Sequence, residues 1–118
     1  FDYESGRAAG NYLLARARSE RPTAIFASSD QQAIGCMRAA YDLGIPIPAA
    51  LSIVGFDGIP LSSMTIPRLT TMKQPIQKIA AAAVAVLLNE RPAPSVDHPI
   101  LFACELSEGE TTATPQPD

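Results

Sequence analysis

The chain has 118 residues, a formal net charge of −3 and 47% hydrophobic residues. This length suits one domain or part of one, and the hydrophobic content is typical of a folded globular protein rather than a disordered one. The nine basic residues form no cluster, which argues against a nucleic-acid-binding surface in this segment. No run of 18 apolar residues occurs, so the sequence predicts no membrane-spanning helix.

Helical and strand-like segments alternate along the chain. Apolar spacing predicts helices over residues 4–20, 31–43 and 75–89. Short apolar runs predict strands over residues 23–27, 51–56, 69–73 and 100–106, followed by a frayed tail over 111–118. Ser5 and Asp30 are the predicted N-caps of the first two helices, and Gly44 ends the second. This alternation predicts an α/β fold with a mainly parallel sheet flanked by helices.

The pattern opens on a helix with no strand before it, so we interpret the chain as a fragment whose first strand precedes Phe1. Cys36 and Cys104 lie far apart in apolar surroundings. They are predicted to be free thiols in a reducing compartment rather than a disulfide.

Polar and aromatic residues follow the predicted strands at the edge where ligands bind in open α/β sheets. Ser28, Ser29 and Asp30 follow one strand, and Asp57 follows another after Phe56. Phe1 would follow the missing strand. Acids, hydroxyls and an aromatic face together are typical of a sugar or polyol site.

Each of these residues also has a purely structural interpretation. Asp30 sits where a helix N-cap belongs, and Ser28 or Ser29 can share that role. Asp57 has no helix behind it to cap, and its alternative is a turn residue. A phenylalanine in the position of Phe56 is more often a core residue than a ligand contact, and the pattern leaves both roles open for Phe1.

The sequence offers little for catalysis. The one histidine, His98, lies in a proline-flanked loop and is predicted to be a surface residue. No nucleophile elbow, metal-ligand spacing or glycine-rich phosphate loop is present, so we expect neither an enzyme nor a cofactor or metal site.

Several motifs occur together in a fixed order: "YESG", "PTAIFA" before an Asp-started helix, "LGIPIP", "SIVGFD", "LTT" and "QP". In this order and spacing the chain closely resembles the lactose/galactose repressor (LacI/GalR) family of bacterial transcription regulators, over roughly residues 1–112. The resemblance implies a periplasmic-binding-protein-like (type I) effector domain of two α/β lobes. It assigns residues 1–66 to the C-terminal lobe, 67–98 to the N-terminal lobe, and 99–118 to a return strand and tail.

The resemblance also implies roles for single residues. Asp57 falls on the acid that hydrogen-bonds the effector, Phe1 on the aromatic residue that packs on it, Ser29 where many members carry a contacting Asn, and Asp30 on the acid after it. Dimer-interface positions fall on Ile34, Ile59, Thr65 and Ile66.

The chain departs from the family pattern in three places. Gly58 replaces a second acid, and Ser29 is a shorter donor than Asn. Ser107, Glu108 and Gly109 replace residues of the usual last strand, which we therefore expect to end near Leu106.

The resemblance implies a cytoplasmic, homodimeric transcriptional repressor that binds a small, sugar-like effector. It would bind operator DNA through a helix-turn-helix outside this segment. A periplasmic-type sugar-binding transport protein is the alternative, and an α/β enzyme a third. The resemblance places the helix over residues 75–89 in the N-terminal lobe, most of which lies outside this segment. Ile76, Ile79 and Val86 on that helix would then lack the residues that normally cover them, so we expect the fragment to self-associate.

Overall fold

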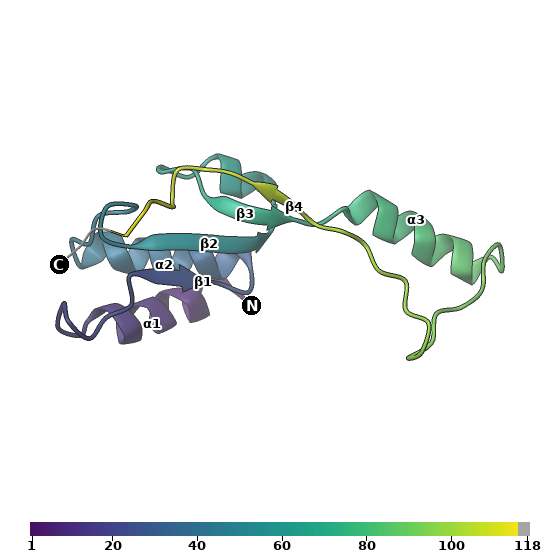
Figure 1. Ribbon diagram of the computed structural model, residues 1–118, viewed down its shortest axis with the longest axis horizontal. Helices are drawn as coiled ribbons and strands as arrows, with labels where there is room; N and C mark the ends of the chain where they lie inside the picture. Colours follow the sequence, from purple (N-terminus) through teal and green to yellow (C-terminus); the bar gives the residue numbers. More distant parts are fainter. Residues whose placement is uncertain (116–118) are drawn as a thin grey trace. The chain divides into compact units, whose positions relative to one another are not determined.

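The computed structural model describes residues 1–115 (Figure 1). In chain order, its elements are α1 (Tyr3–Leu14), β1 (Ala24–Phe26), α2 (Asp30–Asp42), β2 (Ser52–Asp57), the 3₁₀ helix η1 (Pro60–Ser63), β3 (Thr70–Lys73), α3 (Ile76–Leu87) and β4 (Glu105–Ser107). The predicted alternation is confirmed, and Gly44 follows α2 with a φ of 67°. Two predicted elements are too long, because α1 already ends at Leu14 and β4 begins only at Glu105.

The chain divides into two compact units, which we describe separately. The first unit comprises residues 1–73 and the described residues from Leu106 onward, and the second comprises Gln74–Glu105. β3, which the family resemblance groups with residues 67–98, pairs with β2 and lies in the first unit. The assignment of segments to two lobes of a longer domain stays a prediction.

β2 is central to the sheet of the first unit. Within the described residues the strand order is β1-β2-β3-β4. β1 pairs with β2 in parallel, from Ala24 opposite Ser52, and β2 pairs with β3 in parallel, up to Asp57 opposite Lys73. The predicted mainly parallel sheet flanked by helices is confirmed, and the carboxyl ends of its parallel strands share one edge.

The core of the first unit forms where α2 packs against β2, with α1 packed on α2 (Figure 1). Its buried apolar members are Leu14, Ala27, Ala33, Cys36, Met37, Ala40, Ile45, Leu51, Ile53 and Leu69. Most of the buried residues of α2 are small, and this lets the neighbouring helix approach closely.

Two glycines make that close approach possible. A Cβ at Gly6 would lie 2.3 Å from the carbonyl oxygen of Gln32, and one at Gly35 would lie 2.2 Å from that of Tyr3. The Cys36 thiol donates to the Gly6 carbonyl oxygen at 3.2 Å, and burial raises the pKa of this thiol. Both cysteines are free, as predicted.

The N-caps of both helices differ from the prediction by a few residues. Asp2, not Ser5, caps α1: its side chain accepts from the Ser5 N–H, while the Ser5 hydroxyl accepts from the Asp2 N–H. The Ser5 backbone hydrogen bond lowers the pKa of the Asp2 carboxyl. Ser29, not Asp30, caps α2 by accepting from the Gln32 N–H at 3.2 Å. Asp30 is instead the first residue of the helix, and its side chain is buried.

The segment after β4 is not a frayed tail, at least as far as it is described. Thr111 is fully buried, and its hydroxyl hydrogen-bonds to backbone groups of both β2 and β3. Gly109 donates its N–H to the Thr70 hydroxyl, and Ala113 donates its own to the Ser52 hydroxyl. These contacts join residues distant in sequence and leave no local pattern, which explains the wrong prediction. Residues 116–118 of the predicted tail lie outside the described residues.

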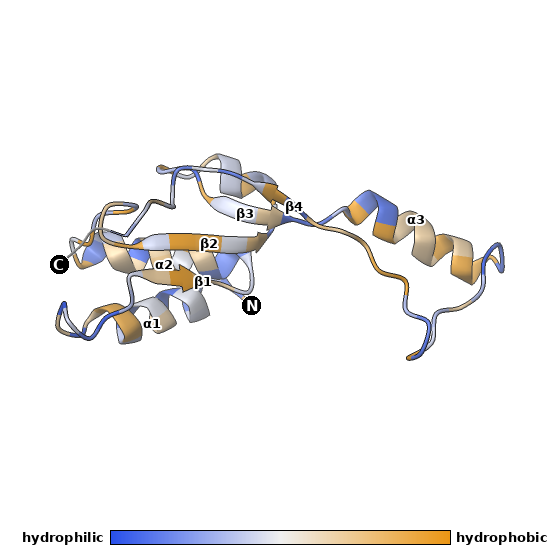
Figure 2. Cartoon of the chain, in the orientation of Figure 1, coloured by the Kyte–Doolittle hydropathy of each residue, from blue (hydrophilic) through white to orange (hydrophobic). Residues whose placement is uncertain are grey.

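The second unit contains α3, which has no buried residue. Apolar residues run along this helix (Figure 2). Ile76, Val84 and Leu87 are all more than half exposed, at 54%, 52% and 80%. Of the three residues predicted to be uncovered, Ile76 is exposed, whereas Ile79 and Val86 are half-buried.

Candidate functional site

The carboxyl ends of the parallel strands bring several predicted site residues to one edge of the first unit. Asp57 ends β2 and lies opposite Lys73, which ends β3. Ser28 and Ser29 follow the end of β1. The N-terminus also lies at this edge, and it places Phe1 there (Figure 1). The edge therefore carries an acid, a base, hydroxyls and an aromatic ring.

Asp57 lies in a backbone conformation that L-residues rarely adopt. Its φ is 118°, and Gly58 follows with a φ of 73°. Residues in such conformations persist only where the surrounding structure holds them in place, and they cluster at ligand sites. Asp57 is half-buried at this edge.

The structure gives a steric reason for Gly58, where the LacI/GalR pattern has a second acid. A Cβ at Gly58 would lie 2.8 Å from the Cα of Lys73 and 2.6 Å from its Cγ. Together with the positive φ, this contact leaves no unstrained place for an aspartate at position 58. The edge therefore carries one acid at the end of β2, beside a lysine.

Asp30 lies differently from the sequence-based expectation. It is fully buried. One carboxylate oxygen accepts from the Ile59 N–H at 2.8 Å, and the other accepts from the Thr71 hydroxyl. A direct effector contact, as predicted for Asp30, does not fit this placement, because both oxygens are engaged inside the protein.

The other two predicted contacts differ strongly in exposure. Ser29 is 5% exposed, and its hydroxyl is occupied in capping α2. Phe1 is 85% exposed and lies free to pack on a ligand. Ser28 is exposed and donates its hydroxyl to the Gln32 side chain at 2.7 Å, which makes it the more accessible hydroxyl of the pair.

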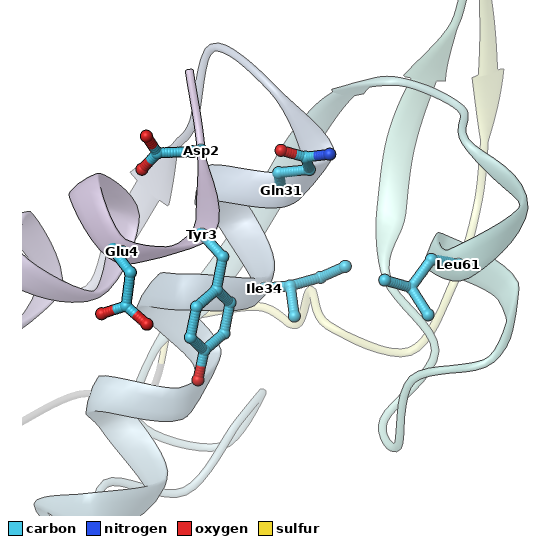
Figure 3. Close-up of a pocket in the computed structure, with 6 residues that line it drawn as sticks. All are labelled: Asp2, Tyr3, Glu4, Gln31, Ile34 and Leu61. Carbon is cyan, nitrogen blue, oxygen red and sulfur yellow. The ribbon is translucent and has the colours of Figure 1, made fainter.

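A second feature of the first unit is a hollow of about 620 Å³ beside the start of α1. It is lined by Asp2, Tyr3, Glu4, Gln31, Ile34 and Leu61. Ile34 from α2 and Leu61 from η1 point toward each other, with Tyr3 on the other side of Ile34 (Figure 3). Ile34 is thus the one predicted interface residue that lines this hollow.

The remaining predicted interface residues lie on or near the η1 segment. Ile66 is 97% exposed, and Met64 beside it is 70% exposed. Thr65 is half-buried, and its hydroxyl bridges the Ser62 carbonyl and the Leu69 N–H. Ile59 is also half-buried, and its N–H is the group that Asp30 holds. Ile66 and Met64 are therefore available to a partner, whereas Thr65 and Ile59 also have internal roles.

Sequence reasoning missed Thr71 and Gly55, which shape the surroundings of Asp30. Thr71 is 1% exposed and donates to Asp30, and Gly55 pairs with Thr71 across β2 and β3. The threonines of "LTT" were the available signal, because a hydroxyl in a strand that becomes buried needs a hydrogen-bond partner.

Residues 1–115 contain neither a candidate metal site nor a candidate membrane-spanning helix. No three or more His, Cys, Asp or Glu side chains gather there in a way that could hold a metal ion. No helix in that range is long and apolar enough to cross a membrane.

Comparisons with known proteins agree with this fold. Residues 2–112 match the family described as the periplasmic binding protein-like domain. The transcriptional regulator MalR of Streptomyces coelicolor is 39% identical over 119 residues, covering 98% of this chain and 33% of MalR. The chain thus belongs to the periplasmic binding protein-like domain family, in the form found in LacI-family transcription regulators.

Solved structures give the same result. The lac repressor dimer bound to operator and the anti-inducer ONPF superposes with a TM-score of 0.83 and 32% identity, covering 96% of this chain and 39% of that one. A LacI-family regulator from Lactobacillus casei with bound sucrose gives a TM-score of 0.80 and 28% identity, covering 95% and 41%. The chain spans about a third of MalR and about two fifths of these structures.

Proposed function

We infer that this chain is the effector-sensing part of a bacterial transcriptional repressor. The observation that carries the inference is Asp57, an acid held in a rare conformation at the carboxyl edge of a parallel sheet. A carboxylate accepts hydrogen bonds from the hydroxyl groups of a sugar, and the exposed ring of Phe1 suits its apolar face. The sucrose bound to the similar Lactobacillus casei regulator supports a sugar-like effector.

The effector would bind between the edge that carries Asp57 and a second lobe, as the family resemblance implies. Binding changes the regulator only if the effector has different affinities for two arrangements of the lobes. The arrangement with higher effector affinity then sets the affinity of helix-turn-helix segments for operator DNA. The operator in the similar lac repressor structure supports a DNA partner. This function needs no catalytic step and no cofactor, and it operates in the cytoplasm.

The working protein is proposed to be a homodimer, in which the hollow between Ile34 and Leu61 receives the same surface of a second copy. Leu61 in η1, and Met64 and Ile66 shortly after it, are exposed apolar side chains. Burying them against their symmetric equivalents removes apolar area from water, which favours association.

DNA binding in the complete native protein tests this proposal. DNA sites are first selected from a randomised oligonucleotide pool, and affinity is then measured by fluorescence anisotropy with and without glucose, sucrose or lactose. The proposal expects at least one sugar to change the DNA affinity. The Asp57→Asn variant should keep its sugar-free DNA affinity and lose the response, because Asn tolerates positive φ but lacks the charge.

Asp97→Asn is the matched control, since Asp97 is an exposed acid in the second unit. It should respond to sugar like the unmodified protein. No DNA binding by the complete protein, or a full sugar response in Asp57→Asn, would contradict the proposal. The first result would instead favour a sugar-binding transport protein.

A further inference from the structure

Asp30 is a buried carboxylate where three segments of the first unit meet. It is the first residue of α2, its Oδ2 accepts from the Ile59 N–H at 2.8 Å, and its Oδ1 accepts from the Thr71 hydroxyl. Ile59 follows the turn after β2, and Thr71 lies within β3. Both partners are donors, so both carboxylate oxygens are engaged by the protein itself.

Gly55 provides the space for this carboxylate. A Cβ at Gly55 would lie 2.3 Å from the Asp30 Oδ1. Gly55 also lies opposite Thr71 in the pairing of β2 with β3. The carboxylate therefore rests on the backbone of β2 two residues before Asp57.

The backbone between Gly55 and Ile59 does not hold its shape by local preference alone. Asp57 and Gly58 have φ values of 118° and 73° in succession. Residues in such conformations persist only where the surrounding structure fixes them. The hydrogen bond from Ile59 to Asp30 fixes the backbone directly after this pair, and the Ile59 carbonyl then accepts the first hydrogen bond of η1, from Ser62, at 3.0 Å.

We propose that Asp30 is a positioning residue that holds the turn aiming Asp57 at the effector. Through Thr71, the same carboxylate ties this turn to β3, after which the chain enters the second unit. This inference rests on the proposed effector contact of Asp57 and deepens it. It gives Asp30 an indirect role in place of the direct contact predicted from the sequence.

Amide hydrogen exchange in the 118-residue chain tests the local step without any ligand. In Asp30→Asn the charged acceptor of the Ile59 N–H is replaced by a neutral amide, and the Ile59 amide should exchange at least about tenfold faster, as expected when a hydrogen bond to a charged group is weakened. The Ile53 amide, bonded to the Thr111 carbonyl at 2.8 Å, is the internal reference and should keep its rate. An unchanged Ile59 rate, or equal acceleration of both amides, overturns the proposal.

Two variants of Thr71 match this experiment. Thr71→Val removes the hydroxyl at similar volume and should accelerate Ile59 exchange in the same direction as Asp30→Asn. Thr71→Ser keeps the hydroxyl and should behave like the unmodified chain. If Thr71→Ser accelerates Ile59 exchange as strongly as Thr71→Val, side-chain volume and not the hydrogen bond holds the turn, and the proposal fails.

A double-mutant cycle tests the functional step in the complete native protein, with glucose, sucrose and lactose as calorimetric probes. Asp30→Asn should weaken sugar binding by about tenfold, yet add nothing in an Asp57→Asn background, because it acts through Asp57. Independent, multiplying losses would overturn the positioning role. If Asp57→Asn alone leaves affinity unchanged, the proposed function fails, whereas the exchange measurement still decides whether Asp30 holds the turn.

Discussion

Thr111 and Ile53 are joined by two hydrogen bonds that fasten the C-terminal segment to the central strand. The Thr111 hydroxyl donates to the Ile53 carbonyl oxygen at 2.6 Å, and the Ile53 N–H donates to the Thr111 carbonyl oxygen at 2.8 Å. The same hydroxyl accepts from the Thr70 N–H at 2.9 Å. One buried side chain therefore links the segment after β4 to both β2 and β3.

Replacing Thr111 with Val should lower the free energy of unfolding by about 2–3 kcal/mol, because the Ile53 carbonyl and the Thr70 N–H lose a buried partner. Urea denaturation of the 118-residue chain measures this loss. Thr112→Val is the matched control, since Thr112 is exposed, and it should stay within about 0.5 kcal/mol. Equal stability of the two variants would show that the Thr111 hydroxyl is not a stabilising link.

Replacing Gly58 with Ala should destabilise the first unit more than replacing Gly44 with Ala. Both glycines have similar positive φ values, 73° and 67°, so both changes introduce backbone strain of about 1 kcal/mol. Only Gly58 adds a steric clash, because its Cβ would meet Lys73, whereas a Cβ at Gly44 meets nothing within 4 Å. Urea denaturation of both variants isolates the clash, and a larger loss for Gly44→Ala would contradict this account of the turn.

Stability should fall at high pH, in part through Cys36. Burial raises the pKa of this thiol above its ordinary value of 9.0, so on raising the pH the unfolded chain loses this proton before the folded one. The folded state then binds more protons, and stability present below pH 9 is lost as the pH rises above it. Urea denaturation at pH 7 and pH 10 should show a smaller pH-dependent loss for Cys36→Ala. An identical loss in both proteins would remove Cys36 as a cause.

The 118-residue chain should self-associate through α3, whose apolar side chains are exposed. Sedimentation velocity over a range of concentrations should show a concentration-dependent average mass. Val84→Lys should shift the population toward monomer, because a charge placed in an apolar contact must be desolvated. Val96→Lys, in an exposed loop outside the helix, is the control and should associate like the unmodified chain. A chain that is monomeric at every concentration would contradict the prediction.

Local chemistry made much of the fold predictable from the sequence. β2 was recognised by its β-branched and apolar residues, and the end of α2 by Gly44, which takes the positive φ that a helix terminus requires. Asp57 was singled out because an acid at the end of an apolar strand has no core role, and its effector contact stays a prediction. These signals depend on neighbours in the chain, so a sequence displays them directly.

Long-range contacts could not be predicted in this way. Asp30 has the position of an N-cap, but Ser29 takes that role, since Thr71 and Ile59 draw the Asp30 side chain inward. Thr111 resembles part of a polar tail, yet it is buried by strands that lie far away in the sequence. In both cases the partner groups are some 30 to 60 residues distant, and no periodicity reports them.

Isothermal titration calorimetry on the complete native protein tests the central claim, that Asp57 contacts the effector, most directly. Glucose, sucrose and lactose are titrated into the unmodified protein, Asp57→Asn and Asp97→Asn. The account predicts that at least one sugar binds the unmodified protein and Asp97→Asn equally well, and that Asp57→Asn weakens this binding roughly ten- to hundredfold, as expected for lost hydrogen bonds to a charged group. Equal affinity of Asp57→Asn for that sugar would contradict the account.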